Sequence, residues 1–148
     1  MTNTKTHHGS CHCGLVQFEV DIDVSKATMC NCTICQKLGA RSINGTPEML
    51  RVLSDESSHT RYGNEYAARY FCPTCGIYCY GKGDIPEIGG PFAAVNINTL
   101  DDIDPSETAL MHWDGRHDNW ESGMSPKPWP VFREGEPRAR RVREAAAV

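Results

Sequence analysis

Cysteine is the residue type in this chain with the greatest capacity for chemistry. Seven of the eight cysteines among the 148 residues fall into three short clusters, and Cys79 lies apart from them. The clusters are Cys11-His12-Cys13-Gly14, Cys30-Asn31-Cys32-Thr33-Ile34-Cys35 and Cys72-Pro73-Thr74-Cys75-Gly76. Closely spaced thiolates prefer a soft or borderline metal ion, and zinc is the ion that such clusters most often bind. The spacing therefore predicts metal binding.

Two other uses of clustered cysteines fit the sequence less well. The even number of cysteines allows disulfides, but the first ten residues hold no apolar segment that would direct export, so we expect a reducing, cytoplasmic environment. A thioredoxin-like redox pair would open the long helix of a βαβ unit, and neither Cys32-x-x-Cys35 nor Cys72-x-x-Cys75 has that setting. Metal binding is the preferred interpretation.

A glycine directly follows the second cysteine in the first and third clusters. Gly14 and Gly76 permit a positive φ, which turns backbone amides toward a sulfur, as in zinc knuckles. We therefore expect these clusters to contribute two ligands each to one zinc ion, and a site closed by four thiolates is structural. Its ligands would be Cys11, Cys13, Cys72 and Cys75.

The middle cluster offers three sulfurs, those of Cys30, Cys32 and Cys35, to an ion that takes four ligands. A fourth position without a protein ligand is typical of catalytic zinc. Three thiolates outweigh the charge of one Zn²⁺, and such an anionic site activates a thiol, with a pKa of about 8.5, more readily than water, with a pKa of about 15.7. We therefore predict a catalytic zinc that binds a small-molecule thiol. In the alternative interpretation, Cys79, a histidine or a carboxylate completes the site, which is then structural.

Composition narrows the remaining possibilities. The 19 acidic and 15 basic residues give a formal net charge of -4 without a basic stripe, so we expect no nucleic-acid partner. No apolar run approaches the roughly 18 residues of a membrane span, so we expect no membrane partner. The hydrophobic fraction of 39% suffices for one core, and 9 prolines with 13 glycines favour short strands and turns. The fold class is therefore expected to be a mainly β single domain with short helices; the sequence does not indicate an oligomeric state.

Short elements must position the cysteines. Residues 14–20 alternate apolar and polar side chains, which predicts a half-buried strand directly after the first cluster. A short helix is expected over 33–41, so that its N-terminal amides stabilise the thiolates of the middle cluster. Further strands are expected at 49–53, 65–71, 76–80, 92–98 and 108–113, and the proline-rich segment 120–137 is expected to wrap around the domain as an arm.

The expected boundaries follow from these elements. Residues 1–7 form a flexible N-terminus, residues 8–137 form the zinc domain, and residues 138–148 form a mobile, basic tail. Basic side chains are scattered through the domain, and several are candidates for binding the carboxylates of a substrate, although isolated surface cations are generally solvated. These candidates are Lys37, Arg41, Arg51, Arg61 and Lys82.

The cysteine motifs resemble those of the glutathione-dependent formaldehyde-activating enzyme family, which also includes centromere protein V. The resemblance covers residues 8 to about 113. It depends on Gly9-Ser10-Cys11-His12-Cys13-Gly14 followed by a strand, Cys30-Asn31-Cys32-Thr33-Ile34-Cys35-Gln36-Lys37-Leu38, and Phe71-Cys72-Pro73-Thr74-Cys75-Gly76. Their order and spacing are highly specific for the family.

The resemblance implies a fold, a metal content and an activity. The implied fold is the mainly β, zinc-binding fold shared with a Rab-associated zinc exchange factor. The family pattern implies two zinc ions, a structural one on Cys11, Cys13, Cys72 and Cys75 and a catalytic one on Cys30, Cys32 and Cys35. The implied activity is formation of S-(hydroxymethyl)glutathione from glutathione and formaldehyde, a carbon–sulfur lyase reaction written in reverse. The exchange-factor relatives suggest the alternative of a zinc-scaffolded binding module without catalysis.

Overall fold

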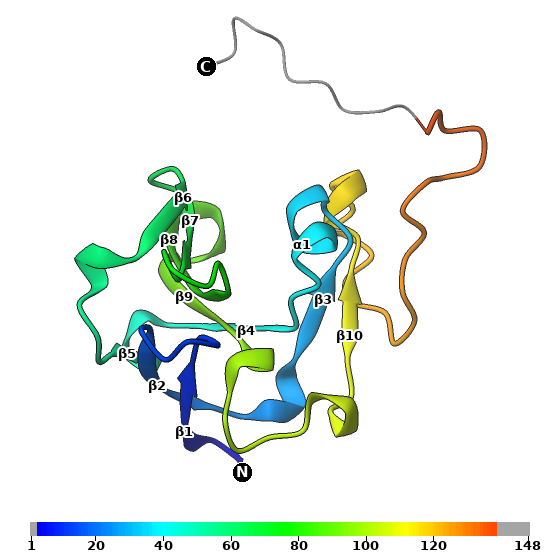
Figure 1. Ribbon diagram of the computed structural model, residues 1–148. Coiled ribbons are helices and arrows are strands. Elements are labelled where there is room, and N and C mark those ends of the chain that lie inside the picture. Colours follow the sequence, from blue (N-terminus) through cyan, green and yellow to red (C-terminus); the bar gives the residue numbers. More distant parts are fainter. Residues whose placement is uncertain (1–2, 139–148) are drawn as a thin grey trace, which may run out of the picture.

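The computed structural model describes residues 3–138, which form two β-sheets and a single short α-helix (Figure 1). The strands are β1 (Lys5–Ser10), β2 (Gln17–Ile22), β3 (Thr28–Cys30), β4 (Ser42–Gly45), β5 (Leu50–Val52), β6 (Thr60–Gly63), β7 (Ala67–Phe71), β8 (Tyr78–Ile85), β9 (Gly90–Asn96) and β10 (Met111–Trp113), and the α-helix is α1 (Thr33–Leu38). Single 3₁₀ turns lie at Val24–Lys26, Pro47–Met49, Glu56–Ser58, Pro86–Ile88, Ile97–Thr99, Pro105–Glu107 and Gly115–His117. The predicted mainly β fold class is confirmed.

The smaller sheet has the strand order β1-β2-β5, and its strands are antiparallel. Buried and half-buried residues alternate along β2, as the sequence predicts, and Phe18 is fully buried. Gly9 of β1 lies opposite Phe18, and a Cβ at position 9 would lie 2.3 Å from Phe18 Cζ. The glycine therefore makes room for the aromatic ring. β2 begins later than the expected residue 14 because the chain first turns, with the Cys11 N–H donating to the Val16 carbonyl at 3.1 Å.

The larger sheet has the order β10-β3-β4-β9-β8-β7-β6. Its buried centre is Tyr80 of β8, whose ring stacks on Tyr70 at a centroid distance of 4.7 Å and lies 6.3 Å from the Phe18 ring of the smaller sheet. One core therefore joins the two sheets. The β3–β10 pair is parallel and lies beside α1 (Figure 1). Strands β1, β3, β4 and β6 are additional to the predicted ones.

The helix α1 ends earlier than predicted. It begins after Cys32 and stops at Leu38, whereas the sequence analysis extended it to residue 41. Gly39 takes the left-handed conformation with φ of 63°, and its N–H donates to the Cys35 carbonyl at 3.0 Å. This cap ends the helix because only glycine adopts that conformation without steric cost.

The two ends of the described chain are anchored to the domain. β1 starts at Lys5, opposite Ile22, so it includes residues 5–7 that were expected in a flexible N-terminus. Beyond β10 the chain folds back as an arm, and Trp129 Nε1 donates to the His112 carbonyl at 3.0 Å. Of the expected mobile tail over 138–148, residues 139–148 lie outside the described part. No described helix is long and apolar enough to cross a membrane.

Candidate metal centres and substrate site

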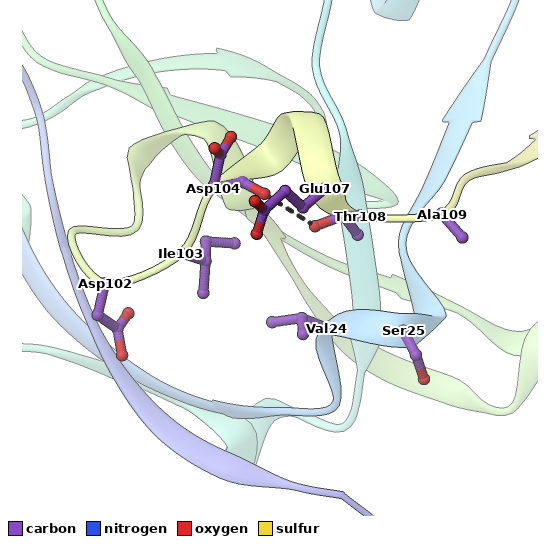
Figure 2. Close-up of a pocket in the computed structure, with 8 residues that line it drawn as sticks. All are labelled: Val24, Ser25, Asp102, Ile103, Asp104, Glu107, Thr108 and Ala109. Carbon is purple, nitrogen blue, oxygen red and sulfur yellow. Dashed lines mark hydrogen bonds between the residues drawn. The ribbon is translucent and has the colours of Figure 1, made fainter.

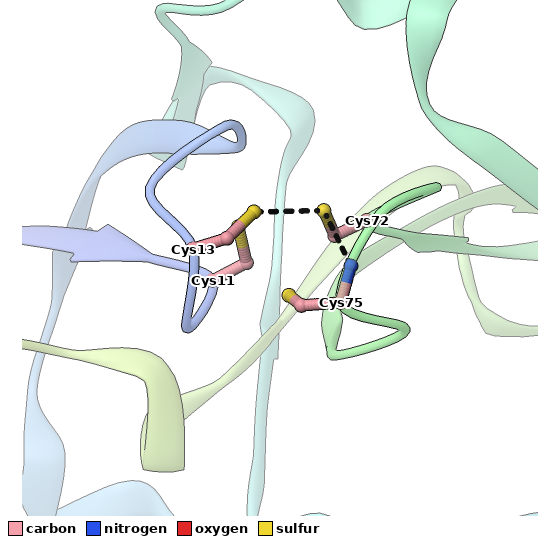
Figure 3. Close-up of side chains that lie close together, drawn as sticks. All are labelled: Cys11, Cys13, Cys72 and Cys75. Carbon is pink, nitrogen blue, oxygen red and sulfur yellow. Dashed lines mark hydrogen bonds between the residues drawn. The ribbon is translucent and has the colours of Figure 1, made fainter.

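The first and third cysteine clusters meet in one group of four sulfurs (Figure 3). One cluster lies in the turn between β1 and β2, and the other lies in the turn between β7 and β8. All four sulfurs lie within 4.8 Å of one another, with Cys11 Sγ 3.7 Å from Cys13 Sγ and Cys13 Sγ 3.5 Å from Cys72 Sγ. A zinc–sulfur bond of about 2.3 Å places tetrahedral sulfurs roughly 3.8 Å apart. The four donors, Cys11, Cys13, Cys72 and Cys75, therefore fit a closed zinc site.

Backbone amides surround the sulfurs of this four-sulfur group. Val16 N–H donates to Cys11 Sγ at 3.3 Å, and the N–H groups of Thr74 and Cys75 donate to Cys72 Sγ at 3.4 Å. Both cluster glycines have the expected positive φ, 84° at position 14 and 76° at position 76. The backbone N–H of Ile77 lowers the pKa of Cys75 to about 6. The turns thus stabilise the thiolate form that binds zinc.

Cys79 belongs to neither group of sulfurs. Its side chain is fully buried in β8 and its thiol donates to the Ile77 carbonyl at 3.5 Å. Burial raises the pKa of Cys79 to about 12, which keeps the thiol protonated. The possibility that Cys79 completes the middle cluster therefore has no support from its position.

The middle cluster forms the second group, with three sulfurs within 4.8 Å of one another. Cys30 ends β3, Cys32 precedes α1 as its N-cap, and Cys35 lies in the first turn of the helix. The Cys32 N–H donates to Cys30 Sγ at 3.4 Å, and hydrogen bonds from the Cys30 and Cys35 thiols hold the pKa of Cys32 far below its usual range. Within the described residues no histidine, carboxylate or further cysteine joins this group. Three donors with no fourth protein ligand fit a zinc ion that keeps one open position.

Comparison with known proteins agrees with the motifs. Residues 6–114 match the family model described as glutathione-dependent formaldehyde-activating enzyme, and this span includes both groups of sulfurs. This chain belongs to the glutathione-dependent formaldehyde-activating enzyme family. It is also similar to the crystal structure of a Rhodobacter sphaeroides protein, with a TM-score of 0.60 and 30% sequence identity; the alignment covers 70% of this chain and 98% of that chain.

In this member of the glutathione-dependent formaldehyde-activating enzyme family, a buried hydrogen-bond network holds the loop between Cys30 and Cys32. Asn31 Nδ2 donates to Asp114 Oδ1 at 2.8 Å, and Asn31 Oδ1 accepts from the Arg116 N–H at 3.0 Å. Asp114 is 2% exposed, and it also accepts from His117 and Asn119. The sequence analysis did not single out Asn31 or Asp114, because their contact spans 83 residues.

The segment after the family match packs against the second group. A Cβ at Gly115 would lie 2.5 Å from Cys30 Sγ and 2.9 Å from Trp120 Cη2, so the backbone of this glycine touches the cysteine. Trp120 is 52% exposed, and its ring lies 5.7 Å from that of Trp113 at the end of β10. Residues beyond position 114 therefore shape the surroundings of the three sulfurs.

The basic side chain that contacts a sulfur of this group is Arg69, which was not among the predicted candidates. Its Nη2 lies 3.6 Å from Cys35 Sγ. Four of the predicted cations have partners elsewhere: Arg51 pairs with Asp21, Lys82 pairs with Glu56, Arg41 donates to the Pro105 carbonyl and Arg61 donates to the Asn64 carbonyl. Lys37 is exposed on α1 and forms no contact with the sulfurs among the described hydrogen bonds. Side chains alternate between the two faces of β7, so the sequence could have placed Arg69 and Phe71 on the face opposite the core residue Ala68. It could not have shown that Arg69 approaches Cys35.

A cavity of about 500 Å³ lies away from both groups of sulfurs (Figure 2). Its lining residues are Val24, Ser25, Asp102, Ile103, Asp104, Glu107, Thr108 and Ala109. Two of its three acidic side chains have local partners: Asp104 Oδ1 accepts from the Ser106 N–H at 2.9 Å, and Asp102 pairs with His7. The cavity contains no cysteine, so the candidate site is the open side of the second group.

Proposed function

We propose that this chain is a zinc-dependent enzyme that joins the sulfur of glutathione, or of a related thiol, to the carbonyl carbon of formaldehyde. The product would be S-(hydroxymethyl)glutathione, and the reverse reaction is that of a carbon–sulfur lyase. The proposal combines the family with one observation, the group of three sulfurs that lacks a fourth protein ligand. Because the cluster must remain reduced, we also propose a cytoplasmic location.

The two groups of sulfurs would have different tasks. Cys11, Cys13, Cys72 and Cys75 would hold a structural zinc that connects the β1–β2 turn with the β7–β8 turn. Cys30, Cys32 and Cys35 would hold the catalytic zinc. Zinc bound there supplies a Lewis acid with one position free for a thiol.

The proposed reaction is a simple addition of a thiol to a carbonyl group. The thiol loses its proton, the sulfur–carbon bond forms as the carbonyl π bond breaks, and the former carbonyl oxygen takes up a proton to become a hydroxyl group; nothing is oxidised or reduced. The residues around the cluster bring the reactants together and orient them, which is the main source of acceleration in such an addition. The Asn31–Asp114 hydrogen bond holds the Cys30–Cys32 loop, and Trp120 borders it beside Gly115.

Exchange of ¹³C-labelled formaldehyde with S-(hydroxymethyl)glutathione, followed by NMR, tests this function. We expect the zinc-loaded protein to accelerate exchange above the spontaneous rate, Cys32→Ser to lose at least about 100-fold of that acceleration through loss of the catalytic metal, and Cys79→Ala to retain it. Cys79 is the matched control, because it is a cysteine outside both groups. If the protein with two bound zinc ions left exchange at the spontaneous rate, the proposed enzymatic activity would be refuted and the non-catalytic binding module would be favoured.

A further inference from the structure

Arg69 in β7 has hydrogen-bonding capacity that the protein itself does not use. Its only hydrogen bond among the described residues is the 3.6 Å contact from Nη2 to Cys35 Sγ, and no described carboxylate forms an ion pair with it. Arg51, by contrast, is neutralised by Glu19 and Asp21. A guanidinium carries five N–H donors, so most of those on Arg69 remain available to an anion beside the cysteine.

The Tyr78 hydroxyl lies on the same face of the sheet as Arg69, beside its cross-strand partner. Gly81 is the cross-strand partner of Arg69, and the Tyr78 hydroxyl lies 3.4 Å from where a Cβ at Gly81 would be. Cross-strand partners project from the same face of a sheet, so Arg69 and the hydroxyl border one patch whose centre is a glycine without a side chain. Gly81 is itself buried beneath the Tyr78 hydroxyl, so the accessible part of the patch lies on the half-buried Arg69 side chain.

This hydroxyl is also unpartnered. Tyr78 is 8% exposed and its ring packs against Phe71, yet its oxygen forms no hydrogen bond with a described residue. Among residues 3–138, every side-chain nitrogen or oxygen that is fully shielded from solvent has a hydrogen-bond partner. Because the Tyr78 oxygen has none, it must be partly exposed to solvent. A buried tyrosine normally finds a partner for its hydroxyl, and here a ligand can provide it.

We infer that Arg69 and Tyr78 form the subsite that recognises a carboxylate of the thiol substrate, beside the second group of sulfurs. A guanidinium matches the two oxygens of a carboxylate, and the tyrosine hydroxyl adds a third donor. The adjacent Cys35 sulfur places the subsite within a few bonds of the position where a substrate sulfur would bind. This inference rests on the proposed function, because it assumes that a thiol binds at the three sulfurs.

Isothermal titration calorimetry of the zinc-loaded full-length chain tests the inference with two thiols of similar size. One is 3-mercaptopropionate, which carries the carboxylate, and the other is 3-mercapto-1-propanol, which does not. We expect the wild-type protein to bind the carboxylate thiol about 10- to 100-fold more tightly, the range for hydrogen bonds to a charged group.

Three variants separate recognition from a merely structural role. Arg69→Met keeps the length of the side chain and removes the guanidinium, so the preference should fall to about 1, while affinity for the alcohol thiol stays the same. Tyr78→Phe keeps the ring packing and should reduce the preference about 3- to 10-fold, as for one neutral donor to a carboxylate. Arg61→Met is the matched control on β6, where the side chain is exposed, and should leave the preference intact.

Each failure has a distinct signature. Equal affinity of the wild-type protein for the two thiols would overturn the subsite while leaving the proposed function in place. Equal weakening of both thiols in Arg69→Met, or loss of the second zinc measured by atomic absorption, would show that Arg69 only supports Cys35, and would also overturn the subsite. If neither thiol bound to the wild-type protein, the proposed function and the subsite would both be overturned.

Discussion

Asn31 and Asp114 are joined by a buried hydrogen bond of 2.8 Å although 83 residues separate them in the chain. Asn31 lies between two of the three sulfurs, and Asp114 is the last residue of the family match. The bond therefore connects the proposed catalytic cluster to the segment that follows β10. Groups that support metal ligands in this way affect metal affinity even though they do not touch the ion.

Replacement of Asp114 by Ala should weaken zinc binding at the second group. The variant removes the oxygen that the Asn31 amide and His117 Nδ1 share and leaves Asn31 with only the longer bond to the Pro130 carbonyl, so we expect about a 10- to 100-fold loss in affinity for the second zinc. We also expect a loss of about 1 to 3 kcal/mol in the free energy of unfolding. Competition with a chromophoric chelator measures the first quantity. Glu121→Ala is the exposed control, and equal zinc affinity in both variants would contradict the supporting role.

The His117 ring should make the C-terminal arm sensitive to pH. Its Nδ1 lies 2.7 Å from Asp114 Oδ1 and its Nε2 lies 3.0 Å from Glu136 Oε2. These two carboxylates raise the pKa of His117, against smaller opposing effects of burial and of Arg133. A raised pKa in the folded state means that the stabilisation is fully present below the unfolded pKa of about 6.5 and is lost as pH rises through the folded value. The difference in unfolding free energy between wild type and His117→Gln should therefore shrink as pH rises above about 6.5.

Denaturant unfolding at a series of pH values, with zinc held in excess, measures that difference. A second readout is the NMR titration of the His117 ring, whose pKa should lie above its ordinary value and fall in Glu136→Gln. A stability difference that stays constant with pH, together with an ordinary ring pKa, would contradict the assignment.

A side chain at Gly115 should disturb the second group of sulfurs. The added Cβ in Gly115→Ala would lie 2.5 Å from Cys30 Sγ, so the sulfur must move and the second zinc should bind more weakly. Gly83→Ala is the matched control: its Cβ would lie 2.1 Å from the Tyr66 carbonyl oxygen in the β7–β8 region. We expect that control to lower the melting temperature without a specific loss of the second zinc. Zinc content and thermal unfolding of both variants check the prediction. It fails if Gly115→Ala and Gly83→Ala lose the same amount of zinc and the same thermal stability.

The two groups of sulfurs should differ in their importance for folding. Cys72→Ser removes a ligand from the four-sulfur group that connects two turns, so we expect an unfolded or molten chain, because structural zinc supplies folding free energy. Cys32→Ser removes a ligand from the group next to α1 and should leave a folded protein with one zinc ion. Circular dichroism and metal analysis compare them. Equal damage from the two substitutions would contradict the division into structural and catalytic sites.

Local patterns predicted those parts of the molecule that depend on short-range chemistry. Alternation predicted β2, and glycines at positions 14 and 76 predicted the turns that aim amides at sulfur. The predicted length of α1 was wrong because Gly39 caps the helix instead of lying inside it. Strand β3 has three residues, which is too few for a periodic signal.

Long-range contacts could not be predicted in the same way. Arg69 is one of several scattered cations in the sequence, and only the tertiary fold brings its guanidinium to Cys35, 34 residues away. Asp114 follows an expected strand, but its partner Asn31 lies in the middle cysteine cluster, where the sequence analysis considered only the cysteines as functional residues. Such contacts depend on tertiary structure, which local propensity does not encode.

The most direct test of the central claim is a glutathione titration of the protein with cobalt(II) in both groups of sulfurs, followed by visible absorption. If a thiol takes the open position at Cys30, Cys32 and Cys35, the cobalt bands should change and saturate with glutathione, and the response should persist in Cys79→Ala and disappear in Cys32→Ser. A spectrum that stays unchanged at saturating glutathione, with both groups occupied by cobalt, would contradict the claim that the second group binds a substrate thiol.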